Sequence, residues 1–323
     1  MAARLLMARE MRRLPAALAV SLLFAASVFG CGRGQGPVAP GPVPAPTASQ
    51  AAPAPAPPPA VVPYVPPETL VGAGDIARCD GGSEATARLL DAIPGTIFTA
   101  GDNTYPTGSA RSFRDCYGPT WGRHKSRTRP SPGNHDYGEP GAAPYYEYFG
   151  ANAGDGRGYY SYMLGAWLVL SLNSNVDAGD GSAQMHWVDH EIAAHPTRCA
   201  LAYWHHPVIT SGPNGDNPHM QAMWRKMARA GVDVVIAGHD HIYERYAEMD
   251  EHLGPAPGGG TRQFIAGTGG AQPYDLVRLQ PLSESRTAVL GVLKMTLRHD
   301  SYDWQFVSVP GVGFHDAGTT ACH

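Results

Sequence analysis

Short apolar runs that end in clusters of Asp, Asn and His constrain this chain more than any other sequence feature. Residues 96–100 (TIFTA) predict a buried strand, and a glycine turn directly after them presents Asp102 and Tyr105. One Gly-Asp turn alone carries little information, because such turns are found in most folds. Four further clusters repeat the arrangement. Predicted strands at 69–73, 200–204 and 234–237 lead into GD at 74–75, HHP at 205–207 and GHDH at 238–241, and a proline-rich loop leads into GNHD at 133–136.

Polar clusters at strand ends predict a metal centre at one edge of a sheet, where open α/β sheets place their reactive groups. Seven side chains offer oxygen or nitrogen atoms as ligands, and a single tetrahedral zinc would use only four. Two six-coordinate ions that share one carboxylate would use all seven, and Asp102 is central in the series. The candidate ligands are Asp75, Asp102, Tyr105, Asn134, His205, His239 and His241.

Tyr105 narrows the choice of metal. A phenol has an ordinary pKa of about 10, so it binds as phenolate at neutral pH only to a strongly Lewis-acidic cation. Ferric iron meets that requirement better than magnesium or calcium does. The sequence therefore predicts a ferric site, with an ordinary half-buried aromatic side chain as the alternative.

The first 30 residues have the features of a secretory signal peptide. Four Arg precede an apolar run at 14–29, which is too short and ends too abruptly for a membrane span. The junction VFGC at 28–31 resembles a bacterial lipobox, in which Cys31 is lipidated and becomes the mature N-terminus. We expect an exported protein, either a cell-surface lipoprotein or a secreted or periplasmic one.

Residues 31–67 predict a linker, because thirteen prolines lie between 37 and 67 and no charged side chain lies between Arg33 and Glu68. Such a segment buries no core and lacks backbone donors, so an extended tether is expected. A ligand for a proline-binding module is the alternative. Residues 68–323 remain as one domain.

The charge of the chain argues against nucleic-acid binding. The whole chain carries −4 and residues 1–30 carry +3, which leaves −7 for the rest. A mildly acidic domain lacks the basic surface that such binding requires.

Four cysteines remain when Cys31 is set aside, and in an exported chain an even set predicts disulfides. Three pairings are possible. We favour Cys79 with Cys116, because both lie in loops after the strands that carry Asp75 and Asp102. Cys199 with Cys322 would then tie down the C-terminal end. Free buried thiols are the alternative.

The periodicity of apolar residues predicts an α/β fold. Helices are expected at 83–93 with Ser83 as cap, at 182–195, and at 219–230 before Gly231. Further strands are expected at 159–163, 166–172, 263–266, 289–297 and 303–309. Because strands dominate the later part, the sheets should be mixed rather than purely parallel.

The five ordered clusters resemble the five motif blocks of the calcineurin-like metallophosphoesterase superfamily. Tyr105 and the segment 238–245 are similar to the purple acid phosphatase branch. The motifs SLNSN at 171–175 and GTGG at 267–270 resemble secreted bacterial members. The similarity covers nearly all of residues 70–310, and it implies a four-layer α/β/β/α sandwich with two mixed β-sheets.

The resemblance also implies how the ligands are shared between two ions. Asp75, Asp102, Tyr105 and His241 would hold a ferric ion. Asp102, Asn134, His205 and His239 would hold a divalent ion, which could be iron, zinc or manganese. His205 is expected to bind in place of His206, because it stands two residues before Pro207.

The implied activity is hydrolysis of a small-molecule phosphate ester by metal-activated hydroxide, most simply as a phosphomonoesterase. His135 would stabilise charge on the phosphate or protonate the leaving alkoxide, and Asp136 would orient its ring; alternatively, His135 only packs. Related sequences carry a phosphate-contacting His near the position of Asn214. Asn214 donates a hydrogen bond but no proton, and His219 is a possible substitute or a surface residue.

Two other functions remain open from the sequence. A phosphodiesterase would use the same metal centre. A catalytically weak, surface-tethered binding module would keep the fold without the chemistry. Loss of ligands would favour the binding module, and no ligand is missing.

Overall fold

The computed structural model describes residue 41 and residues 65–323. The predicted signal peptide, Cys31 and nearly all of the predicted linker lie outside these residues. None of the helices in the described part of the chain is long and apolar enough to span a bilayer. The fold described below is that of residues 65–323.

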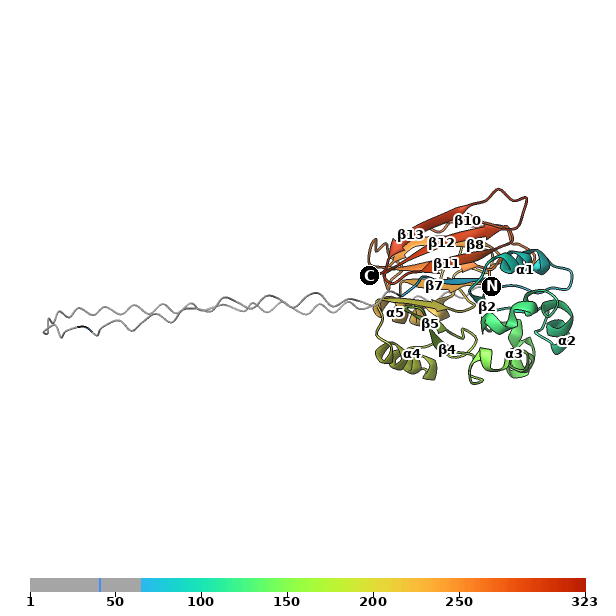
Figure 1. Cartoon of the computed structure of the whole chain (residues 1–323), viewed down its shortest axis with the longest axis horizontal. Helices are drawn as coiled ribbons and strands as arrows, with labels where there is room; N and C mark the ends of the chain where they lie inside the picture. The colour runs from blue at the N-terminus through green and yellow to red at the C-terminus, as the bar shows by residue number, and fades with distance from the viewer. Residues whose placement is uncertain (1–40, 42–64) are drawn as a thin grey trace, which may run out of the picture. The chain divides into compact units, whose positions relative to one another are not determined.

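Two mixed β-sheets form the centre of this domain (Figure 1). In the first, the three strands nearest the N-terminus are parallel and the three late strands pair antiparallel beside them. The order across this sheet is β13 (Asp316–Ala321), β12 (Ser301–Ser308), β11 (Gly291–Leu297), β1 (Glu68–Ala73), β2 (Thr96–Ala100) and β3 (Thr128–Ser131).

The second sheet has seven strands, of which the four in the middle are parallel. Antiparallel strands flank them on both sides. The order is β10 (Ser283–Thr287), β8 (Tyr243–Met249), β9 (Thr261–Ala266), β7 (Val234–Ala237), β6 (Cys199–Tyr203), β5 (Trp167–Ser171) and β4 (Tyr160–Leu164). The predicted mixed sheets are thus confirmed.

Most of the helices lie in the connections between parallel strands. The α-helices are α1 (Ser83–Ala92), α2 (Ala110–Ser112), α3 (Ala143–Phe149), α4 (Ala183–Ala194) and α5 (Gln221–Arg229). A π-helical turn covers Phe113–Tyr117, and 3-10 turns cover Trp121–Arg127, Asp136–Gly138, Pro140–Ala142, Gly150–Ala153 and Pro218–Met220.

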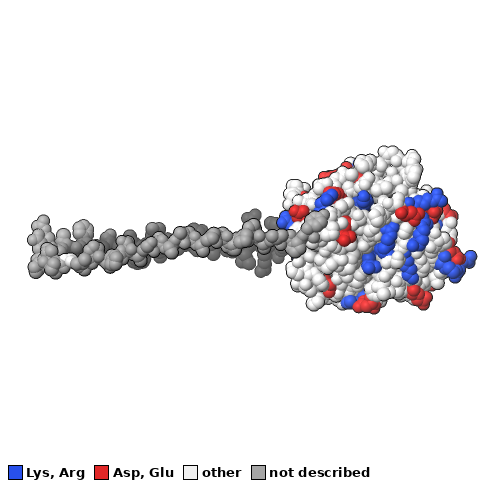
Figure 2. Space-filling view, viewed as in Figure 1, with Lys and Arg blue, Asp and Glu red and all other residues white. Residues whose placement is uncertain are grey.

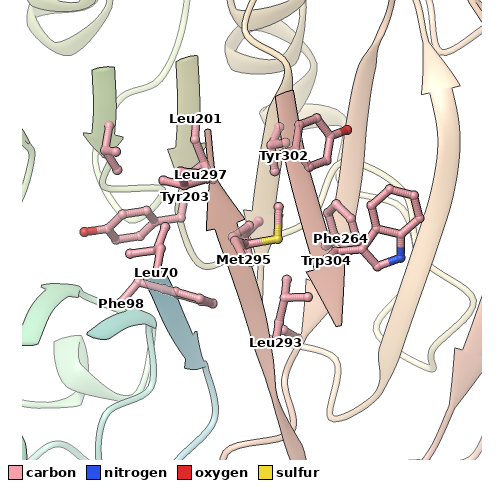
Figure 3. Close-up of a cluster of buried hydrophobic side chains, with 14 of the residues drawn as sticks. Leu70, Phe98, Leu201, Tyr203, Phe264, Leu293, Met295, Leu297, Tyr302 and Trp304 are labelled. Atoms are coloured by element: carbon pink, nitrogen blue, oxygen red, sulfur yellow. The ribbon is translucent and has the colours of Figure 1, made fainter. Parts of the chain in front are cut away.

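Three separate clusters of buried side chains define four layers. Between the sheets, Leu70 and Phe98 of one sheet pack with Tyr203 and Phe264 of the other (Figure 3). The outer face of the seven-stranded sheet buries residues of α4 and α5, and the outer face of the six-stranded sheet buries residues of α1 and α3. The predicted α/β/β/α sandwich is therefore confirmed.

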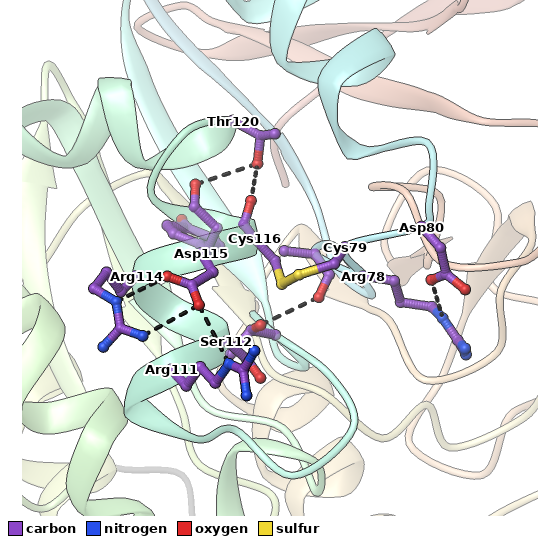
Figure 4. Close-up of a disulfide and its surroundings, with 12 residues drawn as sticks. Arg78, Cys79, Asp80, Arg111, Ser112, Arg114, Asp115, Cys116 and Thr120 are labelled. Carbon is purple, nitrogen blue, oxygen red and sulfur yellow. Dashed lines mark hydrogen bonds and ion pairs between the residues drawn. A yellow bond between two sulfur atoms is a disulfide. The ribbon is translucent and has the colours of Figure 1, made fainter.

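Both predicted disulfides are present. Cys79 joins the loop after β1 to Cys116 in the π-helical turn (Figure 4), and Cys199 at the start of β6 joins Cys322. Their sequence separations of 37 and 123 residues correspond to about 4 and about 5 kcal/mol of lost chain entropy in the unfolded state.

Two local predictions were wrong. Gly82, not Ser83, is the cap of α1, because its carbonyl accepts from the N–H groups of Ala85 and Thr86 at 3.0 and 3.4 Å, while Ser83 already lies inside the first turn. The Gly82 N–H donates to the Gly270 carbonyl at 2.7 Å. The proline-rich stretch before Gly133 forms β3 instead of a loop. Pro130 is accommodated there because β3 is an edge strand, where a missing backbone donor costs little.

A buried carboxylate links the two sheets at the side away from β3. Asp316 of β13 accepts hydrogen bonds from Tyr243 Oη at 2.6 Å and from Arg245 Nε at 2.8 Å, both on β8. Trp304 of β12 also donates to it at 3.3 Å. On the outside, by contrast, Lys and Arg are interleaved with Asp and Glu on the face that Figure 2 shows.

We predict that Asp316→Asn lowers the free energy of unfolding at pH 7 by about 2–4 kcal/mol, because it leaves Arg245 short of a buried partner. Burial alone raises the pKa of Asp316, but the bonds from Arg245 and Tyr243 outweigh it and hold the pKa below its usual value. The stabilisation is thus complete above the unfolded pKa of about 4 and is lost as pH falls through the lower folded pKa.

Denaturant unfolding at pH 7 and at pH 3 measures this effect, and the difference between wild type and variant should shrink at pH 3. Asp80→Asn is the control, since its side chain is 79% exposed and should change stability little. A pH-independent difference would contradict the assignment of an ionised Asp316.

Candidate metal centre

The predicted ligands come from strand ends of both sheets. Asp75, Asp102 and Asn134 follow the parallel strands β1, β2 and β3, and the histidines follow the parallel strands β6 and β7. Asp75, Asp102 and His239 have positive φ angles of 59°, 49° and 70°. Residues other than glycine rarely adopt this conformation, and in folded proteins it is concentrated at functional sites.

Glycine is required where the ligand loops cross. A Cβ atom on Gly133 would overlap the backbone nitrogen and carboxylate of Asp102, and one on Gly101 would overlap the His205 ring. Gly101 and Gly133, which precede Asp102 and Asn134, therefore allow the loops to approach closely enough to bring the ligands together.

Four of the seven side chains form one group, which we call the Tyr105 cluster. The Tyr105 hydroxyl lies 2.9 Å from Asp75 Oδ1, 3.1 Å from Asp102 Oδ2 and 3.1 Å from His241 Nε2. His241 Nε2 is also 3.4 Å from Asp75 Oδ1. These are the residues that the family resemblance assigns to the ferric ion.

The remaining side chains form a second group, the Asn134 cluster, around His205 Nε2. This nitrogen lies 2.9 Å from Asn134 Oδ1, 3.2 Å from His239 Nδ1 and 3.3 Å from Asp102 Oδ1. Asp102 thus directs one carboxylate oxygen into each cluster. His206 bonds instead through Nδ1 to Ser174 Oγ at 2.8 Å, although its ring lies 4.5 Å from that of His239.

Backbone carbonyls fix two of the imidazoles from behind. His205 Nδ1 lies 2.9 Å from the Ala100 carbonyl, and His241 Nδ1 lies 2.7 Å from the Gln272 carbonyl. A carbonyl only accepts, so each Nδ1 carries the hydrogen, and in the neutral ring Nε2 keeps a lone pair that faces the clusters.

The donor set fits metal ions. Asp75 and Asp102 are 0% and 1% exposed, and within residues 65–323 neither pairs with Lys or Arg. Buried carboxylates are costly unless a cation or hydrogen bonds compensate them. Without a cation, burial and the two carboxylates raise the pKa of Tyr105 well above its usual value. Phenolate ligation would therefore need a strongly Lewis-acidic ion.

Burial and neighbouring charges also shift the pKa values of the histidines. Burial lowers the pKa of His205, but Asp102 outweighs it and raises that pKa to about 9. Burial and the neighbouring His205 lower the pKa of His239 to about 4. A cation that takes the place of the proton would satisfy the same carboxylates and free His205 Nε2 for ligation.

His135 stands at the edge of the Tyr105 cluster. Its side chain is 39% exposed, and its Nε2 lies 3.9 Å from Asp102 Oδ2. Its Nδ1 lies 2.5 Å from the Pro106 carbonyl, and its ring is 4.4 Å from the Tyr105 ring.

The prediction that Asp136 orients His135 was wrong. The Asp136 carboxylate accepts hydrogen bonds from the Gly133 N–H at 2.8 Å and from Asn103 Nδ2 at 2.9 Å. These bonds join the loop after β2 to the loop after β3. The Pro106 carbonyl orients the ring instead. A backbone acceptor of this kind leaves no trace in the sequence.

The two predicted substrate contacts have different environments. Asn214 lies beside the Asn134 cluster, where its Nδ2 donates to the His239 carbonyl at 3.1 Å. His219 is an exposed residue of the turn Pro218–Met220, and its side chain contacts no cluster residue in the described part of the chain. The helix predicted from His219 begins at Gln221.

Sequence reasoning missed Tyr274. Its ring stacks on His241 at 3.9 Å between centroids and 13° between planes, and its N–H donates to the His241 carbonyl. The segment that carries it has no helix or strand assigned, so no periodic pattern marked it.

A family model described as calcineurin-like phosphoesterase matches residues 69–243. Purple acid phosphatase PPD1 from yellow lupin (Lupinus luteus) seeds is similar, with TM-score 0.67, 15% identity, and coverage of 80% of this chain and 54% of that chain. GAP50 of Plasmodium, an anchor in the inner membrane complex, has TM-score 0.64, 13% identity, and coverage of 80% and 89%.

A dimetal phosphatase from Danio rerio has TM-score 0.53 and 12% identity, with coverage of 80% of this chain and 100% of that chain. At these identities the structures show a shared fold. This chain spans about half the length of the lupin protein. No curated protein sequence matches.

We predict that removal of bound metal by a chelator lowers the thermal unfolding midpoint, because ligands that bind only the folded state stabilise it. Asp102→Asn removes the carboxylate that faces both clusters and should abolish the response to the chelator. Asp115→Asn, a surface change beside Arg114, should retain it. A thermal unfolding midpoint of the wild type that does not change with the chelator would contradict metal binding at this site.

Proposed function

The chain belongs to the calcineurin-like phosphoesterase family, and from that membership we propose that it is a phosphomonoesterase similar to the purple acid phosphatases. The centre would hold a ferric ion in the Tyr105 cluster and a divalent ion, iron, zinc or manganese, in the Asn134 cluster. Family membership supports phosphoester hydrolysis at a dinuclear metal centre, and the monoester preference and the iron are our proposal.

The division of the Asp102 carboxylate between the two clusters is the observation that carries the proposal. Oδ2 lies 3.1 Å from the Tyr105 hydroxyl, while Oδ1 lies 3.3 Å from His205 Nε2. One carboxylate can therefore serve two neighbouring ions, one of them beside a phenol. When bound, such ions would offset the charge of the phosphate and lower the pKa of an attacking water.

His135 is the proposed proton donor to the leaving oxygen. Its Nδ1–H is directed to the Pro106 carbonyl, so in the protonated ring Nε2 carries a second hydrogen toward the site. The side chain is also partly exposed, as a group that contacts substrate must be. Geometry of this kind suits a general acid, whose contribution is usually about 10²- to 10⁴-fold.

Asn214 would bind the phosphate. One hydrogen of its amide goes to the His239 carbonyl, which leaves the second for a phosphate oxygen. An amide holds substrate but transfers no proton. Proton transfer would therefore depend on His135, and His219 has no role in the proposal.

We also propose that the protein is exported and that its substrate is a small-molecule phosphate ester. A lipid on Cys31, with the proline-rich segment as a tether, would hold the domain near a membrane. The acidic net charge supports a small-molecule substrate over nucleic acid.

We predict that the iron-loaded protein is coloured and that Tyr105→Phe removes the colour. Tyrosinate bound to ferric iron absorbs visible light by charge transfer, and phenylalanine keeps the ring but lacks the oxygen. Some activity should survive, because the other ligands remain. Absorption spectra and metal analysis of both proteins provide the measurement.

Tyr145→Phe is the matched control for the colour, since Tyr145 is buried and its hydroxyl has no hydrogen-bond partner in the described structure. It should keep the absorption band. A Tyr105→Phe protein that binds iron and keeps the same band would exclude Tyr105 as the ligand.

His135→Ala should keep metal content and colour while turnover falls by about 10²- to 10⁴-fold. The loss should be larger for alkyl phosphates than for nitrophenyl phosphate, whose leaving oxygen needs little protonation. Steady-state rates on both substrates are the measurement, with His219→Ala as a control that should leave both unchanged. Equal losses on both substrates would assign phosphate binding, not proton donation, to His135.

A further inference from the structure

Three of the most exposed apolar side chains lie in one short segment next to the metal centre. Leu276, Val277 and Leu279 are 38%, 56% and 63% exposed, and we call them the apolar rim. Single exposed apolar residues are ordinary. Three exposed apolar residues within four positions are not scattered singly. They also lie close to the predicted metal centre, which suggests a role in binding.

One end of this segment is attached to a predicted metal ligand. The Gln272 carbonyl accepts from His241 Nδ1 at 2.7 Å, and the Tyr274 N–H donates to the His241 carbonyl at 3.1 Å. The Tyr274 ring stacks on the His241 ring. The apolar rim thus begins two residues after a side chain that covers the Tyr105 cluster.

The other end lies beside the loop that carries Asn214. Backbone N–H groups of Val277 and Arg278 donate to the Ser211 carbonyl at 3.1 and 3.3 Å. A Cβ on Gly215 would stand 3.3 Å from the Arg278 guanidinium. The segment therefore runs from His241 to the neighbour of Asn214, along the edge of both clusters.

The backbone of this segment is held in place. Gln280 donates to the Thr210 carbonyl at 3.0 Å and to Asp216 Oδ1 at 2.7 Å, in addition to the bonds of Val277 and Arg278. With both ends fixed, the apolar side chains have little freedom to turn inward. Their exposure is a stable property of the folded chain, and it keeps apolar surface in water at a cost.

We propose that the apolar rim binds the hydrocarbon part of the substrate alcohol, so that the substrates are phosphate monoesters of long-chain alkyl or prenyl alcohols. This inference rests on the proposed phosphomonoesterase function. A phosphate at the two clusters would direct its ester oxygen outward, and the rim is the exposed apolar stretch of the segment that contacts His241 at one end and Ser211 at the other.

Size and charge favour a substrate chain over a protein partner. Three side chains offer far less area than the roughly 1,000 Å² that a specific protein interface requires, but enough for several methylene groups. Arg278, within the rim, has no ion pair or side-chain hydrogen bond in the described residues, so its guanidinium is available to the anionic end of an amphiphile.

The test is a series of primary alkyl phosphates from ethyl to decyl, each below its micelle concentration. In the metal-loaded wild type, kcat/KM should rise with chain length by up to about fourfold per methylene group. The variant Val277→Ser/Leu279→Ser should flatten this dependence and leave ethyl phosphate unchanged. Met163→Ser/Val176→Ser, which alters exposed apolar residues elsewhere, should behave as wild type.

Calorimetric binding of ethylphosphonate and decylphosphonate gives a readout that needs no turnover. The decyl compound should bind more tightly to wild type and lose that advantage in Val277→Ser/Leu279→Ser. Vesicle sedimentation and analytical ultracentrifugation test the other occupants of the rim. Loss of vesicle binding or of self-association in this variant, without an effect on chain-length dependence, would assign the rim to a membrane or a second copy and overturn the proposal.

The two proposals fail in distinguishable ways. Hydrolysis of ethyl and nitrophenyl phosphates without dependence on chain length would overturn the apolar-chain substrate and leave the phosphomonoesterase intact. Absence of hydrolysis of every ester would overturn the phosphomonoesterase. Rim-dependent binding of decylphosphonate in such a protein would still support an apolar phosphate ligand.

Discussion

The burial of Asp75 and Asp102 side by side is the constraint on which the rest of the site depends. Neither carboxylate has a Lys or Arg partner in residues 65–323. Two carboxylates buried next to each other repel, because both are negatively charged. Besides His205, whose pKa Asp102 raises to about 9, the partners are neutral donors, among them the Tyr105 hydroxyl and the backbone N–H groups of His135 and His239. Such donors position the carboxylates but do not neutralise them, so a cation is the natural complement.

The site exists only if the two sheets keep their relative position. Asp102 belongs to one sheet and His205 to the other, yet their ligand atoms lie 3.3 Å apart. The core between the sheets, with Phe98 packed against Tyr203, sets that position on one side. The buried Asp316 and Arg245 contacts tie the sheets together on another. Closely packed protein interiors deform little. A site built across two such sheets can therefore be preorganised.

The sequence predicted the strands, which depend on local periodicity, and the disulfides, which depend on the number and placement of the cysteines. The apolar runs before Asp102 and His239 became strands β2 and β7 within the predicted bounds, and an even cysteine count supported the correct pairs. Contacts to backbone groups of distant segments were not predictable. Three such contacts are those of the Gly270, Pro106 and Gln272 carbonyls with Gly82, His135 and His241. Because every residue type has the same backbone carbonyl, the sequence does not mark which one accepts such a bond.

The segment after β9 connects the predicted ligand His241 to the proposed apolar rim. Gln272 and Tyr274 hold His241, and Leu276 to Leu279 follow within five residues on the same backbone. Because Ser211 anchors the far end, a change in the rim that shifts this backbone would also move the imidazole. The side chains of Val277 and Leu279 are the most exposed of the segment, and Val277 helps to hold it only through its backbone N–H. If the rim binds substrate as proposed, substrate range could vary there without moving the predicted ligand His241, whereas a change at Tyr274 would disturb that imidazole.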